Sequence, residues 1–171
     1  MNKPSGLGLV NAAGVAQGLA LVTFPAASTI FTSPNGYGFS ETRYGLMFLP
    51  QVVMAILASS AAPKLARRWS LKRVLLVGLG SDIAAMLLLA MSRLVKTEQG
   101  FAYGLLLIAT GALGFGFGAA LTALSTLAEV LSPGREDRSV LTLNALLGTG
   151  TALAPCLVMF RKSTTRTSSG K

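Results

Sequence analysis

Five long apolar runs alternate with short polar segments along the chain of 171 residues. A helix needs roughly 20 mainly apolar residues to cross a bilayer, and each run is close to that length or longer. The runs are too long for β-strands and apolar on nearly every face, which lipid permits and water disfavours. The pattern therefore predicts an all-α, polytopic transmembrane bundle within residues 1–160. Its expected spanning helices cover residues 6–31, 44–62, 74–92, 101–128 and 140–160.

The polar segments between the runs have the composition of turns. Residues 32–42 read "TSPNGYGFSET" and residues 131–139 read "LSPGREDRS", both rich in Pro, Gly, Asn and Ser. After the last run, residues 161–171 form a basic, Ser/Thr-rich tail that is predicted to be disordered. A cleavable signal peptide is an alternative for the first run, but the run is longer than usual and four more follow.

Composition excludes several classes of function. Only 12% of the residues are charged, about half the share in an average soluble domain. The net charge of +9 comes from short basic islands rather than from a continuous stripe, so no nucleic-acid partner is expected. The chain has no histidine and a single cysteine, which argues against a metal site, a hydrolase triad or a disulfide. We therefore expect no enzyme activity and no cofactor.

Lysine and arginine in the short connections predict the orientation, because cytoplasmic loops carry more of them. With the N-terminus inside, the inner segments hold eight and the outer loops hold three. This bias predicts a multi-pass protein of the cell inner (plasma) membrane with a cytoplasmic N-terminus, and Trp69 as an interfacial anchor. The inner set is Lys3, Lys64, Arg67, Arg68, Lys72, Arg73, Arg135 and Arg138, and the outer set is Arg43, Arg93 and Lys96.

The basic tail does not fit five crossings. It carries four positive charges and would lie outside after an odd number of spans. One explanation is an incomplete chain whose function needs a missing C-terminal bundle or a second copy. The other is that a short tail is translocated despite its charge.

Glycine pairs at a spacing of four residues predict close helix packing. Gly14 and Gly18 form such a pair in the first run, and Gly114 and Gly118 form one in the fourth. Small residues on one face let helix backbones approach closely within a membrane. The stretch "GFGFG" lacks the spacing of a dinucleotide or phosphate loop, so packing is its expected role.

Asp82 is the one ionisable residue well inside an expected span, eight residues into the third run. A carboxylate there costs several kcal/mol unless it is paired, hydrated or protonated. It is a candidate coupling or gating group for a proton or cation, and a structural hydrogen bond is the alternative. Uncharged polar residues within the spans either line a solute path or bond across helices. The candidates for the path are Asn11, Gln17, Thr110 and Thr122.

The stretch "KLARRWSLKR", residues 64–73, follows the second expected span. The order of spans, this basic connection and the glycine-rich fourth run resemble the N-terminal half of a major facilitator superfamily transporter. The hallmark of that family after the second helix reads roughly G-x-L-A-D-R-x-G-R-K. This chain departs from it at three positions: Arg67 replaces the acidic residue, Ser70 replaces the second glycine, and Leu71 replaces the first basic residue after that glycine. The matching residues are Leu65, Ala66, Arg68 and Lys72, with Arg73 adding a further charge.

The resemblance implies a secondary transporter of a small solute with twelve helices in two halves. In that family the solute path runs between the halves, beside the first and fourth helices. Alternating access needs a second bundle, so this chain is not expected to transport by itself. The alternative function is a small membrane scaffold or assembly protein that uses its glycine faces to bind other helices.

Overall fold

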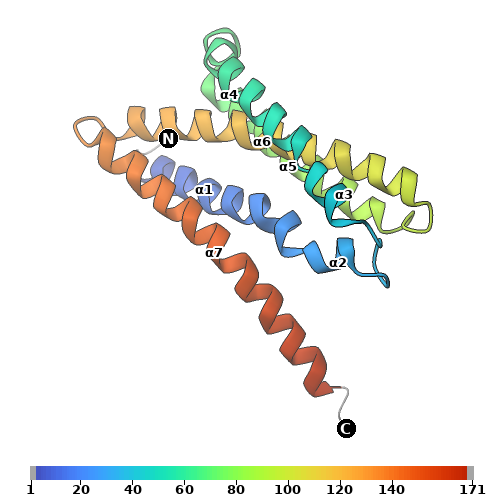
Figure 1. Ribbon diagram of the computed structural model, residues 1–171. Coiled ribbons are helices and arrows are strands. Elements are labelled where there is room, and N and C mark those ends of the chain that lie inside the picture. Colours follow the sequence, from blue (N-terminus) through green and yellow to red (C-terminus); the bar gives the residue numbers. More distant parts are fainter. Residues whose placement is uncertain (1–2, 169–171) are drawn as a thin grey trace.

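The computed structural model describes the backbone of residues 3–168 and the side chains of residues 6–153. Within these limits the chain is all-α, which confirms the predicted fold class. Figure 1 shows long helices packed side by side, with two short helices near one end. The elements are α1 (Lys3–Ala26), α2 (Ser28–Thr32), α3 (Glu41–Leu46), α4 (Leu49–Trp69), α5 (Leu71–Ser92), α6 (Gln99–Leu131) and α7 (Glu136–Ser168).

Helix α6 is the centre of the bundle. It packs against α1, α4, α5 and α7, whereas α4 and α5 have α6 as their main neighbour. Of its most apolar stretch 56% is buried, against 28% or less in the other three spanning stretches. The outer helices therefore expose apolar side chains, as helices in contact with lipid do. Examples are Ile56, Leu76 and Ile83, each more than half exposed.

Among the residues that the structure describes, four helical stretches are long and apolar enough to cross a membrane, and they indicate a membrane protein. They cover Gly6–Thr32, Glu41–Trp69, Leu71–Ser92 and Gln99–Leu131, close to the first four predicted runs. The fifth predicted run lies on α7, but its residues 154–160 fall outside the described side chains. The first stretch bends at Ala27, shortly after Pro25, because proline removes a backbone hydrogen bond.

The end of α7 differs from the prediction. The helix continues to Ser168, where the sequence predicts a disordered tail from residue 161. No proline or glycine interrupts residues 161–168, so each added residue extends an existing ladder without a new nucleation step. Residues 169–171 of the predicted tail lie outside the described backbone.

The basic segment 62–73 also differs, because it is not a loop. Helix α4 runs to Trp69 and α5 begins at Leu71, so Ser70 alone joins them. Ser70 has φ 117°, a backbone conformation that glycine adopts most readily. Its side chain accepts a hydrogen bond from the backbone N–H of Arg73 at 3.4 Å and caps α5.

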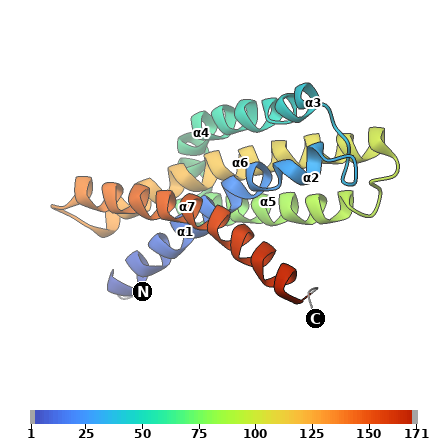
Figure 2. The ribbon, with the colours of Figure 1, turned by 60° about the horizontal axis from the view of Figure 1, so that its bottom comes forward.

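The two ends of the bundle hold different connections. Figure 2 shows the start of α1 and the α6–α7 connection at one end, and the loop after α2 and the α5–α6 connection at the other. We call the first the basic end, since the α4–α5 turn also lies there, and the second the aromatic end. All seven cationic residues between Lys64 and Arg138 that the topology assigns to the basic end carry exposed side chains.

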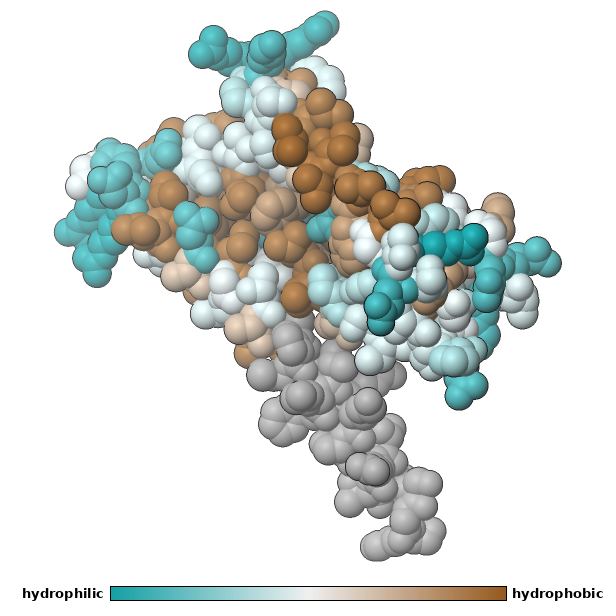
Figure 3. All heavy atoms as spheres, viewed as in Figure 1, coloured by the Kyte–Doolittle hydropathy of each residue, from teal (hydrophilic) through white to brown (hydrophobic). Residues whose placement is uncertain are grey.

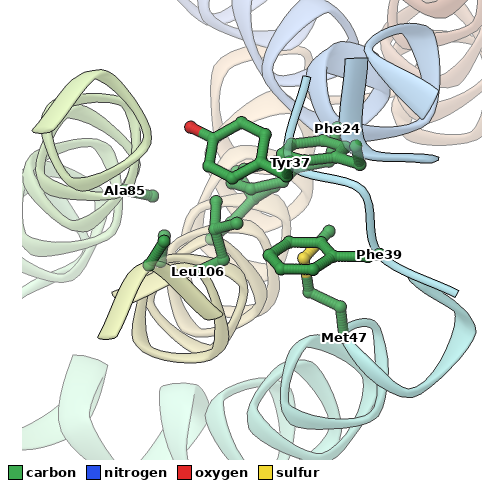
Figure 4. Packing of buried hydrophobic residues seen from close by; sticks show 10 residues of the cluster. Phe24, Tyr37, Phe39, Met47, Ala85 and Leu106 are labelled. Carbon is green, nitrogen blue, oxygen red and sulfur yellow. The ribbon is translucent and has the colours of Figure 1, made fainter. Parts of the chain in front are cut away.

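Rings from one end of α1, from α2 and from the loop 33–40 fill the aromatic end. Phe31 stacks on Phe24 with ring centroids 6.2 Å apart, and Tyr37 and Phe39 follow at 5.4 Å steps. Figure 4 shows Tyr37 and Phe39 reaching in from the loop toward Leu106 of α6. The hydroxyl of Tyr37 lies 2.6 Å from that of Ser92, and Gln99 donates to the Tyr37 carbonyl. This loop is therefore part of the core and closes its end of the bundle.

Candidate functional site

The centre of the bundle contains a polar pair. Nε2 of Gln17 on α1 donates a hydrogen bond of 2.5 Å to Oδ2 of Asp82 on α5. Gln17 is 1% exposed and Asp82 is 6% exposed. Because α5 begins at Leu71 rather than at residue 74, Asp82 lies about 15 Å from either end of its helix. The predicted intramembrane carboxylate is thus near the middle of its span, and one predicted path residue lies against it.

Two glycines make room for this pair. A Cβ on Gly116 of α6 would overlap the Asp82 carboxylate and the carbonyl of Gly78. Gly78 and Asp82 are four residues apart and share a face of α5, and Gly116 and Ala120 meet that face from α6. Sequence reasoning missed Gly78 and Gly116. One signal in the sequence could have identified Gly78: it precedes Asp82, the acid within an apolar run, by one helical turn and so shares its face of the helix.

The pair holds acceptor atoms that are not used. Within the described side chains, Oδ1 of Asp82 and Oε1 of Gln17 are buried and have no hydrogen-bond partner. An unmade hydrogen bond at a buried acceptor costs about 1–3 kcal/mol, more for a charged group. No basic residue occurs in α1 after Lys3, or in α6 from Phe101 to Leu131. The site therefore has the chemistry to take a proton, a small cation or a hydrogen-bond donor.

The other predicted path residues do not converge on this pair. Asn11 lines a cavity of about 490 Å³ at the basic end, together with Arg135 and Arg138. Thr122 lines a different cavity of about 340 Å³. Thr110 is fully buried, and its hydroxyl donates to the carbonyl of Leu107 in its own helix. The structure thus brings Gln17 to Asp82 and leaves the remaining three apart.

The glycine pairs lie at contacts between helices of the same chain. Gly14 and Gly18 face α7, where a Cβ would overlap Leu143 and the carbonyl of Leu147. Gly114 and Gly118 face α4, where a Cβ would overlap the backbone of Gln51 and Ala55. Close approach of these backbones is what small residues permit in a membrane. Both glycine faces are therefore already covered within the chain.

The cationic residues of the hallmark segment surround the α4–α5 turn. Lys64, Arg67 and Arg68 lie in the last turns of α4, and Lys72 and Arg73 in the first turn of α5, all exposed. Leu65 and Ala66 are half-buried against the core. Figure 3 shows hydrophilic residues at this tip above a largely apolar surface. The segment thus has an apolar inner face and a cationic outer face.

In the part of the chain that the structure describes, no three His, Cys, Asp or Glu side chains lie close enough together to hold a metal ion. No family model, no curated protein and no solved structure matches the chain. The resemblance to major facilitator transporters therefore depends on the residues quoted above.

Proposed function

We propose that this chain is a helical bundle of a secondary transporter of the major facilitator type. It moves a small solute across the inner (plasma) membrane, with its N-terminus in the cytoplasm, and it catalyses no reaction. A second bundle, either a C-terminal half or a second copy, completes the solute path. Asp82 with Gln17 is the coupling or gating site for a proton or cation.

One observation carries this proposal: a buried carboxylate near mid-span joins two helices and keeps one oxygen without a partner. Ionisable groups at such depth are costly and commonly mark ion or solute pathways. A purely structural role would favour a fully satisfied pair, since every unmade bond is a loss. The Asp82–Gln17 bond also links α1 to α5, so loading the carboxylate changes a contact between two helices.

The α4–α5 turn supports the family assignment at one position. Ser70 occupies the place of the second glycine in the hallmark, and its φ of 117° is the conformation for which glycine is best suited. The orientation is supported by the charge distribution, with the larger set of cations at the basic end. The scaffold alternative is less favoured, because the glycine faces it requires already pack within the chain.

The test uses inverted membrane vesicles from cells that produce the protein, so that any partner bundle is retained. The vesicles contain a trapped pH-sensitive dye, and a panel of sugars, amino acids and organic cations is added one at a time. We expect solute-dependent proton movement that Asp82→Asn abolishes. Asp137→Asn, which neutralises an exposed acid in the first turn of α7, is the matched control and should transport normally.

Two results would contradict the proposal. Transport by Asp82→Asn with an unchanged pH dependence would remove the carboxylate from coupling. No flux of any solute from vesicles that contain the folded protein, together with a stable homo-oligomer in detergent, would favour the scaffold.

A further inference from the structure

A cavity of about 340 Å³ lies at the basic end between α4, α5 and α6. Its size falls within the range of small-molecule sites, roughly 300–1,000 Å³. Most of its lining is apolar, and the polar groups are Arg67, Thr122 and Thr126. The apolar part comprises Ala62, Pro63, Ala66, Leu71, Val74 and Ala123.

The threonines do not make this cavity a polar solute site. Thr122 donates its hydroxyl hydrogen to the carbonyl of Gly118, and Thr126 donates to the carbonyl of Thr122. Both donors are therefore used within α6, as is common for threonine in membrane helices. Arg67 is left as the donor of the cavity, at its exposed rim. The site thus offers one cationic group above an apolar hollow.

The surroundings of the cavity add charge of the same sign. Lys64, Arg68, Lys72 and Arg73 are exposed beside Arg67, and neither α4 nor α5 carries an acidic residue before Asp82; on α6 the exposed Glu129 follows Thr126 by one turn. Trp69 is 46% exposed at the same tip, a residue type that favours the membrane–water interface. The helices that line the cavity are three of the apolar, membrane-length stretches. The cavity therefore lies where lipid headgroups meet acyl chains.

We propose that this cavity binds one anionic phospholipid, with the phosphate on the guanidinium of Arg67 and an acyl chain in the hollow. An arginine recognises phosphate through paired N–H donors, and the neighbouring cations raise the local concentration of anionic lipid. A soluble anion fits less well, because it leaves the apolar lining without a partner. The inference depends on the membrane location of the chain and not on transport.

The test measures the association of spin-labelled phosphatidylglycerol with the full chain in phosphatidylcholine vesicles. Arg67→Gln should weaken the preference for the anionic lipid about fivefold, the effect of one basic residue near a membrane surface. Ala66→Leu keeps every charge and fills the hollow, and it should lower the bound fraction to a similar degree. Arg138→Gln, a cationic residue of the other cavity at the same end, is the matched control and should change little.

Three outcomes would overturn the proposal. An equal loss in Arg138→Gln would mean that diffuse charge attracts the lipid. Unchanged binding in Ala66→Leu, with helix content and melting temperature retained, would show that the hollow holds no chain. Full displacement of the lipid by inorganic phosphate at constant ionic strength would assign the site to a soluble anion.

Discussion

The aromatic end and the glycine contacts at the centre of the bundle are packed by opposite means. At the aromatic end, Phe31 and Tyr37 fill space with large rings, and a loop supplies part of the core. At the centre, Gly114 and Gly116 bring helix backbones together by having no side chain. Lipid supplies no hydrophobic drive between helices, so both solutions depend on dispersion contacts. The stability of the aromatic end should therefore fall when side-chain atoms are removed, and the stability of the glycine contacts should fall when atoms are added.

The largest expected effect is a truncation at the aromatic end. Phe31→Ala removes a ring that is 1% exposed and stacks on Phe24, and it should destabilise the folded state by about 3–5 kcal/mol. Ile30→Ala is the matched control, because its side chain is 40% exposed, and it should cost less than about 1 kcal/mol. Denaturant unfolding in detergent micelles measures both. Equal losses in the two variants would mean that the aromatic end is not a packed core.

The next effect comes from adding a single methyl group at the centre. Gly114→Ala places a Cβ into the backbone of Gln51 and should cost about 2–3 kcal/mol through strain between α6 and α4. Gly104→Ala, on the same helix, meets no atom within 4 Å and should be neutral or slightly stabilising, because alanine favours a helix. The same unfolding assay separates them. A neutral Gly114→Ala would show that α4 and α6 are not in close contact.

Hydrogen bonds sharpen the contrast between the two regions. Gln17→Leu leaves the Asp82 carboxyl without its donor and should cost about 2 kcal/mol. Tyr37→Phe should cost about 1 kcal/mol, since Ser92 keeps a bond of 2.7 Å to the carbonyl of Leu89. Thermal unfolding of the two variants in one detergent gives the comparison. The order would be reversed if the Tyr37 hydroxyl, rather than the Asp82–Gln17 pair, were the main polar link between helices.

The sequence predicts the first four membrane-length helices well, because long apolar runs between turn formers leave few other structures. It also identifies Asp82 and Gln17 separately, as polar residues in apolar surroundings. It does not predict that they meet, since the contact depends on how α1 is rotated relative to α5. The inward position of Tyr37 and Phe39 is missed for a related reason. Gly and Pro mark residues 32–42 as a turn, but the local pattern does not say that its rings enter the core.

The smallest expected effect lies at the α6–α7 connection, far from the aromatic end. The Glu136 carboxylate accepts a hydrogen bond of 2.7 Å from the backbone N–H of Gly134, and this bond lowers the pKa of Glu136 below its ordinary value. A lowered pKa in the folded state adds stability that is present above the pKa of the unfolded chain. This stability is lost as the pH falls through the lower, folded value. An NMR titration should therefore find the Glu136 midpoint below that of an unfolded peptide.

Glu136→Gln is the matching variant, because it keeps the shape of the side chain and removes its titration. It should flatten the small decline in the stability of this connection between about pH 5 and pH 3. The stability losses caused by Phe31→Ala and Gly114→Ala should stay the same in its presence. A Glu136 midpoint at or above the peptide value would show that the bond to Gly134 is not formed in solution. Because the carboxyl group is fully exposed, water and salt weaken its contribution. The α6–α7 connection at the basic end thus includes a solvent-exposed hydrogen bond from Gly134 to Glu136, whereas the loop at the aromatic end is held by buried rings.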